Sequence, residues 1–441
     1  MKIVQGVGWY YPDSWGGTEI YVSALAHRLR SAGHTVAVAA PDPSQRHERR
    51  YEHDGIPVYR YPIPMSPTRA EAQGGTIVRG AEHFHRWLEA FQPDIAHFHT
   101  FVTGLGLAEV DAARRAGARV IATTHAATLG FICARGTMMR WGTEPCDGIT
   151  EEQKCAACML QHRGVPRSAA AIAARTPRPA ADLLRRLPGR AGAMFALPSF
   201  VRDQQARQQR LLTSVDRFVL LTDWAGRTVI ANGAPPSKVA VNRLGIAARL
   251  PTPKPGPDTR PTTLPLRLAY LGRFDPIKGI DGLVRALTSL PADLPFRAEI
   301  IGPVFTPGEQ RVVDDLQKLI GRDPRISICA AIPHAAVPKA LAELDLLCCP
   351  SLVAEGGPTV AIEAHAVGTP VIGTRIGGLA ELVTDGINGR LVAPGDWRGL
   401  ADVLRTVLSD PRGTIDAWRR ALPPARTFDA VTRDYLAMYT A

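Results

Sequence analysis

The chain has 441 residues, of which 45% are hydrophobic and 21% charged, enough apolar material for two ordinary hydrophobic cores. Its start, KIVQGVG over residues 2–8, reads as a strand and a glycine loop without the long apolar core of a signal peptide. Apolar runs stay well short of the roughly 20 residues that cross a bilayer. These features argue against a secretory leader and a membrane span, and they predict a soluble, two-domain protein in the cytoplasm.

The net charge of +11 is unevenly distributed along the chain. Between Arg163 and Arg210 there are ten arginines and only two acidic residues, Asp182 and Asp203. Such a surface attracts anions, among them phospholipid headgroups, a lipid diphosphate or nucleic acid. We therefore expect an anionic surface, such as the inner face of a membrane, as a partner; the alternative is a set of arginines that are simply solvated.

The first half of the chain alternates strand-like and helical patterns from its start. KIVQGVG is followed by a helix from about Thr18 to Ala32 and then by HTVAVAA, which begins a βαβ series. Further strands are predicted at residues 58–61, 95–99, 120–124, 218–221 and 239–242. This pattern predicts a parallel, helix-covered sheet in a first domain over residues 1–248.

A proline-rich segment separates this domain from a second series of the same kind. Residues 250–265 contain six prolines, which predicts a linker over 249–265. Strand patterns such as LRLAYLG, AEIIG, LDLLCCP and TPVIGT follow, which gives a second doubly wound domain over 266–425. Residues 426–441 predict a helix that packs back on the first domain. The fold class is therefore α/β, with two Rossmann-like domains that face each other across a ligand cleft.

The stretch from Leu344 to Thr374 contains the strongest chemical pattern, in which a buried strand gives way to a Gly-Gly loop and a helix. Pro358 suits a first helical turn, whose free N–H groups and dipole favour an anion. Glu363 falls on the apolar face of that helix, so its carboxylate needs a partner there. Either a buried ion pair or ligand hydroxyls would supply it, and Glu355, eight residues earlier, favours the functional interpretation.

LGRFDPIKG, at residues 271–279, follows the first strand of the second domain. Arg273 and Lys278 are expected on the loop at the carboxyl end of that strand. Two cations beside a helix N-terminus suit a diphosphate, the arginine through its planar fork and the lysine as a point charge. A surface loop can hold two basic residues by chance, but their combination with Glu355 and Glu363 favours a diphosphate site.

The second domain resembles that of the retaining glycosyltransferases of GT-B fold called family 4, or glycosyl transferases group 1. The resemblance is carried by GRFDPIKG, the pair Glu355 and Glu363, GTPVIGTRIGGLAELV and DGINGRLVAPGD. It implies that Arg273 and Lys278 hold the donor diphosphate, that Glu355 reaches the transferred sugar and that Glu363 binds the ribose. The loop EGGPTV departs from the family, which often has an aromatic residue after the first glycine. The sugar that the enzyme would use is therefore not implied.

The first domain resembles the family through WGGTE, PDIAHFHT, ATTHAA and NRLGI. His125 would then face the transferred sugar, although a single histidine after a strand is often structural. The resemblance extends over residues 2–128 and from 217 to the end and does not cover the middle. It further implies donor-binding roles for Gly17, Gly272, Gly302, Ile332, Gly357 and Thr359, and acceptor-side roles for Gly16, Thr18 and His99.

The activity implied is the transfer of a sugar from a nucleotide donor of UDP or GDP type to a glycan or lipid-linked acceptor, in surface polysaccharide or glycoconjugate biosynthesis. The family is thought to work by attack on the face that the leaving group occupied, with the leaving phosphate accepting the acceptor proton. With two cations on the diphosphate, a catalytic divalent metal is not required.

Four cysteines, Cys133, Cys146, Cys155 and Cys158, follow closely after His125, in an insert predicted over residues 129–215. Their spacing, C-x12-C-x8-C-x2-C, suits tetrahedral zinc in a cytosolic chain. An iron–sulfur cluster uses the same donors and is the less favoured metal centre, and free thiols are the other alternative. The insert lies in the domain expected to bind the acceptor, so it is predicted to shape acceptor choice.

Two further classes of function remain open at this point. A nucleotide-sugar epimerase on the same fold would act on its substrate without an acceptor. A basic, zinc-containing nucleic-acid-binding protein would explain the charge and the cysteines. However, the cysteines lack an adjoining basic recognition helix and the doubly wound domains would have no role, so nucleic acid is not expected as a partner.

Overall fold

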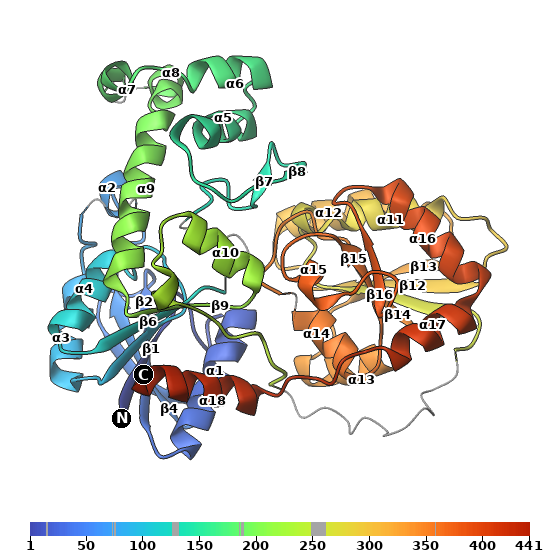
Figure 1. Cartoon of the computed structure of the whole chain (residues 1–441), viewed down its shortest axis with the longest axis horizontal. Coiled ribbons are helices and arrows are strands. Elements are labelled where there is room, and N and C mark those ends of the chain that lie inside the picture. The colour runs from blue at the N-terminus through green and yellow to red at the C-terminus, as the bar shows by residue number, and fades with distance from the viewer. Residues whose placement is uncertain are drawn as a thin grey trace. The chain divides into compact units, whose positions relative to one another are not determined.

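The structure is a computed structural model of the chain and describes residues 1–14, 16–72, 74, 76–125, 132–184, 186, 189–247, 262–357 and 359–441. Within them the chain forms two compact units (Figure 1). The first contains residues 1–141, 146–243 and 428–441, and the second contains 142–145 and 244–427. Most of the predicted linker lies outside the described residues, as do Trp15, Ala126, Ala127 and Pro358 of the motifs above.

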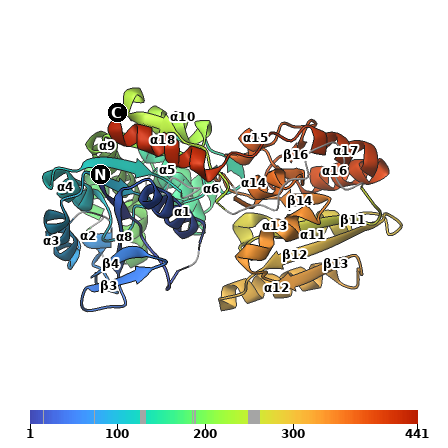
Figure 2. The ribbon, with the colours of Figure 1, turned by 90° about the horizontal axis from the view of Figure 1, so that it is seen from below.

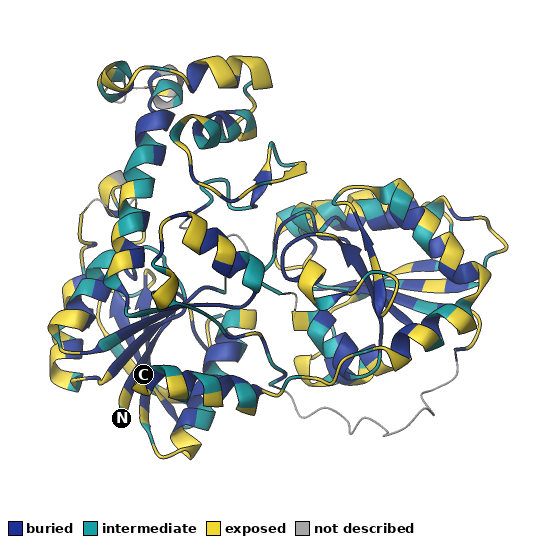
Figure 3. Ribbon diagram, viewed as in Figure 1, coloured by how far each residue is buried: buried dark blue, intermediate teal, exposed yellow. Residues whose placement is uncertain are grey.

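The first unit is built on an eight-stranded sheet in the order β10-β9-β6-β5-β1-β2-β4-β3. Neighbouring strands are parallel except at the β3–β4 edge. The strands are β1 (Lys2–Gly6), β2 (Thr35–Asp42), β3 (Arg49–His53), β4 (Ile56–Pro62), β5 (Ile95–Phe98), β6 (Arg119–Thr123), β9 (Arg217–Leu220) and β10 (Val239–Val241). Most of their side chains are buried, as expected for a parallel sheet covered on both faces (Figure 3).

The antiparallel edge strand β3 differs from the purely parallel sheet that the sequence predicted. It forms a hairpin with β4 through Asp54 and Gly55, which both have positive φ, at 48° and 75°. An Asp-Gly pair with this backbone is typical of a two-residue hairpin turn. The dipeptide was the signal in the sequence that would have identified this strand.

The helices of the first unit connect these strands or pack beside them. They are α1 (Gly17–Ser31), α2 (Arg69–Ala72), α3 (Ala81–Phe91), α4 (Leu107–Arg115), α5 (Glu152–His162), α6 (Arg167–Ala173), α7 (Arg178–Leu184), α8 (Gly189–Phe195), α9 (Leu197–Ser214), α10 (Asp223–Ala231) and α18 (Phe428–Thr440). The last of them, α18, lies beside α1 (Figures 1 and 2). Its buried face includes Phe428, Val431 and Tyr435, so the chain end completes the core of this unit.

Helices α5 to α8 gather around the N-terminal half of α9, away from the sheet (Figure 1). They enclose a small apolar core that includes Ala156, Leu160, Leu197 and Val201. A two-stranded hairpin of β7 (Met139–Arg140) and β8 (Glu144–Pro145) precedes them. The cysteine-rich region is thus a helical subdomain with a core of its own.

The second unit has a six-stranded, fully parallel sheet in the order β13-β12-β11-β14-β15-β16. Its strands are β11 (Leu266–Leu271), β12 (Phe296–Gly302), β13 (Ile326–Ala330), β14 (Leu346–Cys349), β15 (Val371–Thr374) and β16 (Gly389–Val392). Its helices are α11 (Ile280–Thr288), α12 (Pro307–Ile320), α13 (Val337–Ala342), α14 (Thr359–Ala366), α15 (Leu379–Leu382), α16 (Trp397–Ser409) and α17 (Pro411–Arg420). Figure 2 shows α12 near the β13 edge and α16 and α17 near the β16 edge.

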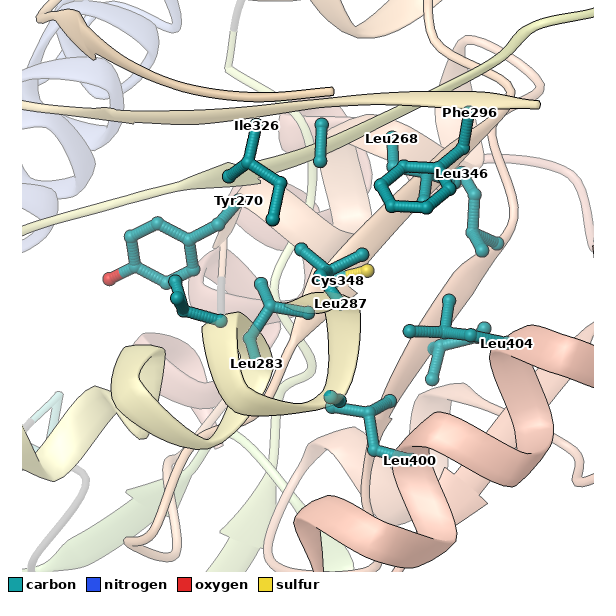
Figure 4. Packing of buried hydrophobic residues seen from close by; sticks show 14 of the residues in the cluster. Leu268, Tyr270, Leu283, Leu287, Phe296, Ile326, Leu346, Cys348, Leu400 and Leu404 are labelled. Atoms are coloured by element: carbon teal, nitrogen blue, oxygen red, sulfur yellow. The ribbon is translucent and has the colours of Figure 1, made fainter. Parts of the chain in front are cut away.

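Alternation along the strands assigns these helices to two faces of the sheet. Leu268 and Tyr270 of β11 pack in one cluster with α11, α12, α16 and α17 (Figure 4). Ala269, between them, packs in a second cluster with α13, α14 and α15. Successive side chains of a strand point to opposite faces, so each helical layer covers one face of a two-sided core.

Among the described residues, no helix combines the length and the hydropathy needed to cross a membrane.

Candidate active site

In the second unit the strand order reverses between β11 and β14, the two central strands, since β12 lies on the far side of β11 and β15 on the far side of β14. In open α/β sheets of this kind, ligands bind in the crevice at the carboxyl ends of the strands on either side of such a switch point. The loop after β11 contains Gly272, Arg273 and Lys278, and the loop after β14 contains Glu355. The sequence motifs therefore meet where the topology favours ligand binding.

A short ion pair joins these two loops. Lys278 Nζ lies 2.7 Å from Glu355 Oε1, and both side chains are largely shielded from solvent, at 24% and 14% exposure. Ser351 Oγ also donates a hydrogen bond to Glu355 Oε1, at 2.6 Å. A half-buried carboxylate with two donors on one oxygen is held in one orientation. The sequence had not identified Ser351 as part of this site, although its position four residues before Glu355 was visible.

The backbone of Glu355 is held by the two glycines of the GTRIGGLAELV segment. Gly378 donates its N–H to the Glu355 carbonyl at 2.7 Å. Gly377 has φ of 56°, and a Cβ there would lie 2.7 Å from the same carbonyl oxygen. A side chain at position 377 would therefore displace the Glu355 loop, which gives a physical reason for the glycine pair.

Arg273 is the more exposed of the two cations, with 61% of its side chain open to solvent. Its carbonyl is fixed by the Tyr270 hydroxyl, which donates a hydrogen bond at 2.7 Å, while its guanidinium lies 3.7 Å from Asp275. Lys278 ends a 3-10 turn, Pro276–Lys278. The arginine is thus anchored through its backbone and leaves an extended, solvated side chain beside the switch point.

Gly302, at the end of β12, lies against the Gly272 loop. A Cβ on Gly302 would come within 2.2 Å of the Gly272 carbonyl oxygen and 3.0 Å of Phe274. Because backbone cannot move away as a flexible side chain can, only glycine fits this contact. The ends of β11 and β12 are therefore closely packed at the predicted donor site.

Glu363 lies on α14, and 16% of its side chain is exposed. Burial raises the pKa of its carboxyl to about 7. His334 Nε2 is 3.9 Å from Glu363 Oε1, beyond hydrogen-bond distance. The first interpretation made from the sequence, a buried ion pair, therefore has little support. A largely buried carboxyl with a raised pKa is typical of a group that binds a ligand, which was the second interpretation.

Three further predicted donor residues lie near the ends of these elements. Thr359 is the first residue of α14, and Gly357 precedes it in the loop. Ile332 follows β13 and packs partly against the core cluster on the α13 and α14 side of the sheet. Their positions are compatible with contacts to a nucleotide, and their binding roles stay predictions.

In the first unit the strand order reverses between β1 and β5. Gly16 is the N-cap of α1 and Gly17 and Thr18 form its first turn. A Cβ on Gly16 would lie 2.7 Å from Glu19, whereas one on Gly17 would meet no atom within 4 Å. Gly17 thus leaves an open approach to the helix N-terminus, where backbone N–H groups favour an anion.

His99 and His125 lie together at the carboxyl ends of β5 and β6. His99 Nδ1 is 3.0 Å from His125 Nε2, and His99 is fully buried. Burial lowers the pKa of His125 to about 3, so the imidazole is neutral at physiological pH. The sequence predicted that both residues lie near the site, but it did not identify Gln5 and His97. The alternation of the HFHT stretch could have suggested His97, which lies two residues before His99.

The four cysteines of the insert are free thiols. Cys158 Sγ accepts a hydrogen bond from the Trp141 backbone at 3.4 Å and lies 3.9 Å from Arg135. Burial raises the pKa of Cys155 to about 11 in the metal-free protein. Within the part of the chain that the structure describes, no three His, Cys, Asp or Glu side chains are grouped to hold a metal ion. The prediction of structural zinc, or of an iron–sulfur centre, is thus without structural support.

Each of the two units is an α/β domain with a reversal of its strand order. At each reversal, glycine loops and ionisable side chains lie at the carboxyl ends of the strands, as in proteins of the GT-B fold. Residues 260–421 match the family described as Glycosyl transferases group 1, and residues 15–173 match Glycosyltransferase Family 4. The chain belongs to glycosyltransferase family 4. The second match continues through the four cysteines, so the family covers more of the middle region than the resemblance in the sequence indicated.

Curated relatives include D-inositol 3-phosphate glycosyltransferases of Mycobacterium tuberculosis and Mycobacterium bovis. They are 32% identical to this chain over 251 residues, which cover 53% of this chain and 50% of the relatives. The chain thus matches about half the length of these relatives.

Solved structures of the same fold span the whole chain. Sucrose-phosphate synthase from Thermosynechococcus elongatus has a TM-score of 0.66 at 17% identity and covers 100% of this chain and 98% of its own. Anabaena Alr3699/HepE in complex with UDP and glucose has a TM-score of 0.61 at 15% identity, with 100% and 99% coverage. At these identities the likeness establishes the fold.

Proposed function

We propose that the protein is a retaining glycosyltransferase that moves a sugar from a nucleotide-diphosphate donor, of UDP or GDP type, to a glycan or lipid-linked acceptor. The observation that carries the proposal is the Lys278–Glu355 pair at the strand switch point, with Arg273 beside it and Glu363 on the following helix. Lys278 and Arg273 suit the diphosphate, Glu355 suits the hydroxyls of the sugar, and Glu363 suits the ribose. Similar structures solved with UDP and UDP-glucose support this donor class.

The chemistry follows from the charges. Departure of the nucleoside diphosphate breaks the bond between the sugar C1 and a phosphate oxygen and leaves negative charge on that oxygen. Arg273 and Lys278 would stabilise this charge, and they would do so more strongly as it develops, which is how positioned cations lower a barrier. The acceptor oxygen then bonds to C1 on the same face, and its proton passes to the leaving phosphate oxygen, so no protein base is needed.

Glu355 would bind hydroxyls of the transferred sugar. In the free protein its carboxylate is already oriented by Lys278 and Ser351, which lowers the entropy lost when a sugar binds. Glu363 would accept hydrogen bonds from the ribose hydroxyls, which would stabilise its charged form. His125 and the Gly16–Gly17 turn would serve the sugar and the acceptor in the first unit.

Acceptor choice is assigned to the insert of the first unit. Exposed arginines just after α5, α6 and α7 include Arg163, Arg175 and Arg186, and exposed apolar residues of α6 and α7 include Ile172 and Leu183. A mixed basic and apolar surface suits an amphiphilic, anionic acceptor such as a lipid-linked glycan at a membrane. A role in surface polysaccharide or glycoconjugate synthesis is proposed on this basis.

The test is release of nucleoside diphosphate from UDP-, GDP- and ADP-sugars in the presence of candidate acceptors. We expect one donor to be turned over, and Lys278→Ala to lower kcat at least about a hundredfold, the typical effect of removing one transition-state donor. Lys318→Ala is the matched control, because Lys318 is an exposed lysine on α12 of the same unit whose ammonium pairs with Asp315, three residues earlier on the same helix. Equal activity in the Lys278 and Lys318 variants would remove the donor-site assignment.

The stereochemical claim needs a separate observation. A retaining enzyme gives a product whose anomeric configuration equals that of the donor, which the proton coupling at C1 reports. An inverted product would contradict same-face attack while leaving the donor site intact. Turnover of the nucleotide sugar without any acceptor would instead favour epimerisation or hydrolysis.

A further inference from the structure

A line of buried hydrogen bonds connects the strands beneath the predicted site to the end of the chain. Tyr439 Oη, on α18, is 2.7 Å from His97 Nδ1, and Thr123 Oγ1 is 2.7 Å from His97 Nε2. Thr123 Oγ1 is also 3.0 Å from the hydroxyl of Tyr435, the other inward-facing tyrosine of α18. Helix α18 therefore contributes polar groups, as well as apolar packing, to the interior of the first unit.

A second line leads to His125 itself. His99 Nε2 is 2.5 Å from Gln5 Oε1, and His99 Nδ1 is 3.0 Å from His125 Nε2. The rings of His97 and His99 lie with centroids 4.0 Å apart, and Gln5, His97 and His99 are all 0% exposed. His99 thus has one partner on each nitrogen and links Gln5 to His125.

The three imidazoles are neutral. Burial, reinforced by the neighbouring imidazoles, lowers the pKa of His97 and of His99 well below the ordinary value, and burial alone lowers that of His125 to about 3. A neutral imidazole has one N–H donor and one bare nitrogen acceptor. Each hydrogen bond in the line therefore fixes the direction of the next one.

We propose that Gln5 and His99 are positioning residues that hold His125 in the tautomer with its proton on Nε2. The amide oxygen of Gln5 can only accept, so His99 carries its proton on Nε2 and presents a bare Nδ1. That bare nitrogen can only accept from His125 Nε2–H. His125 Nδ1 is then the unprotonated nitrogen, which can accept a hydrogen bond from a sugar hydroxyl.

The side-chain amide of Gln5 also lies near the Tyr439 hydroxyl, and this contact lowers the pKa of that phenol against the larger rise caused by burial. With Oε1 facing His99, the amide nitrogen is the atom left to face that hydroxyl. The same hydroxyl lies 2.7 Å from His97 Nδ1, and a phenol that donates to that nitrogen is left as an acceptor toward Gln5. Gln5 Nε2 makes no hydrogen bond of ordinary geometry among the described residues. If the amide oxygen and nitrogen of Gln5 changed places, the donors and acceptors in both lines of hydrogen bonds would be exchanged. His125 would then carry its proton on Nδ1.

The functional part of this inference rests on the proposed glycosyl transfer, whereas the tautomer does not. A fixed acceptor at His125 Nδ1 orients a substrate hydroxyl without a proton having to move first, which lowers the cost of reaching the reactive geometry. The chain end would thereby be part of the catalytic unit, although Tyr439 touches no substrate in this proposal.

The tautomer is measured directly by long-range 1H–15N NMR of protein labelled with 15N-histidine, with the His125 signals assigned from the spectrum of His125→Gln. We expect a single neutral form of His125 protonated on Nε2. A signal for the form protonated on Nδ1 would overturn the proposal. This measurement needs neither a substrate nor turnover, so it stands even if glycosyl transfer is not found.

Variants of Gln5 then test the connection. Gln5→Glu keeps an oxygen acceptor toward His99 and should retain the tautomer, whereas Gln5→Met removes the acceptor and should give a mixture of both forms. In the transfer assay Gln5→Met should lose about tenfold in kcat with little change in KM, since one hydrogen bond in the transition state is worth about 1.4 kcal/mol. An unchanged tautomer in Gln5→Met would contradict the positioning role.

Tyr439→Phe should lower kcat in the same way and broaden the His125 signals into a mixture. Tyr61→Phe is the matched control. Tyr61 is buried in the same unit and donates its hydroxyl to the Gly104 carbonyl at 2.6 Å, outside both lines of hydrogen bonds. Equal losses of kcat in the two variants would mean that Tyr439 acts through stability alone.

Discussion

At the scale of one residue, the largely buried carboxyl of Glu363 lowers the free energy of unfolding of the free protein at neutral and higher pH. Its pKa is raised to about 7 by burial, from an ordinary value of 4.5. Between these two values the unfolded chain has already lost the proton that the folded chain keeps, so the free energy of unfolding falls as the pH rises, and the whole cost is present above pH 7. The carboxylate is thus unfavourable in the free protein, and under the proposed function the ribose hydroxyls would stabilise it.

We predict that Glu363→Gln stabilises the free protein at pH 8 by roughly 2 kcal/mol and has little effect at about pH 3, where both states hold the proton. The same variant should weaken nucleotide binding about tenfold or more, because a hydrogen bond to a charged acceptor is lost. Thermal unfolding at the two pH values, with calorimetric titration of the nucleotide, measures both. A variant less stable than the wild type at pH 8 would show that the carboxylate has a structural partner.

At the scale of elements, the donor site depends on the close approach of strand ends. We predict that Gly302→Ala lowers turnover and donor affinity together, because its Cβ would meet the Gly272 carbonyl oxygen at 2.2 Å and push the Arg273 loop away. Gly282→Ala, in helix α11 of the same unit, is the control: its Cβ meets only an ordinary contact with Trp397 at 3.7 Å. It should gain up to about 1 kcal/mol of stability, since alanine is the better helix former. Wild-type kinetics in Gly302→Ala would show that the two loops are not coupled.

Whether the insert binds a metal is a second question at this scale. The spacing of the cysteines predicts a metal site, whereas the described side chains are not grouped to hold a metal ion. Elemental analysis of freshly purified protein, and unfolding with and without a chelator, decide between them. About one zinc per chain, with a fall in Tm on chelation, would support the prediction from spacing. Metal-free protein with an unchanged Tm would establish Cys133, Cys146, Cys155 and Cys158 as thiols packed in the helical subdomain.

Much of the fold could be predicted because its elements are strongly patterned. Continuous apolar runs such as LRLAYLG identified the buried parallel strands, and β11 and β12 lie where these runs predicted them. The edge strand β3 was missed because its residues are mostly polar and half-exposed, so it has no hydrophobic period. Residues 169–190, rich in alanine and arginine, could be predicted only as helical with proline interruptions, because these residues give little contrast between faces; α6, α7 and α8 overlap this region.

The site was predicted to a different degree in its two halves. Arg273, Lys278 and Glu355 could be named because motifs place them in the loops after β11 and β14, and Glu363 because its motif places it on the helix that follows. In the first unit, the residues that we propose to position His125 could not be predicted. The contact of Tyr439 with His97 spans 342 positions of the chain, and no local pattern encodes a hydrogen bond at that separation.

At the scale of the whole molecule, we propose that the second unit binds the nucleotide and, through Glu355, the transferred sugar, whereas the first unit supplies further sugar contacts and the acceptor contacts. Binding of a nucleotide should therefore depend on residues of the second unit alone. Substitutions of His125, His99 or Gln5 should leave nucleoside diphosphate affinity unchanged while they lower turnover. Titration calorimetry with the nucleotide checks this, and a large loss of affinity in His125→Gln would contradict the division of roles.

The most direct test of the central claim is thermal unfolding in the presence of UDP, GDP or ADP, repeated on Glu363→Ala and Lys278→Ala. A ligand that binds only the folded state at a hundred times its Kd adds about 2.7 kcal/mol, which is readily seen as a rise in Tm. We predict that one of these nucleotides raises the Tm of the wild type and that the rise is reduced or lost in both variants. A Tm unchanged by all three nucleotides, or raised equally in the wild type and the variants, would contradict it.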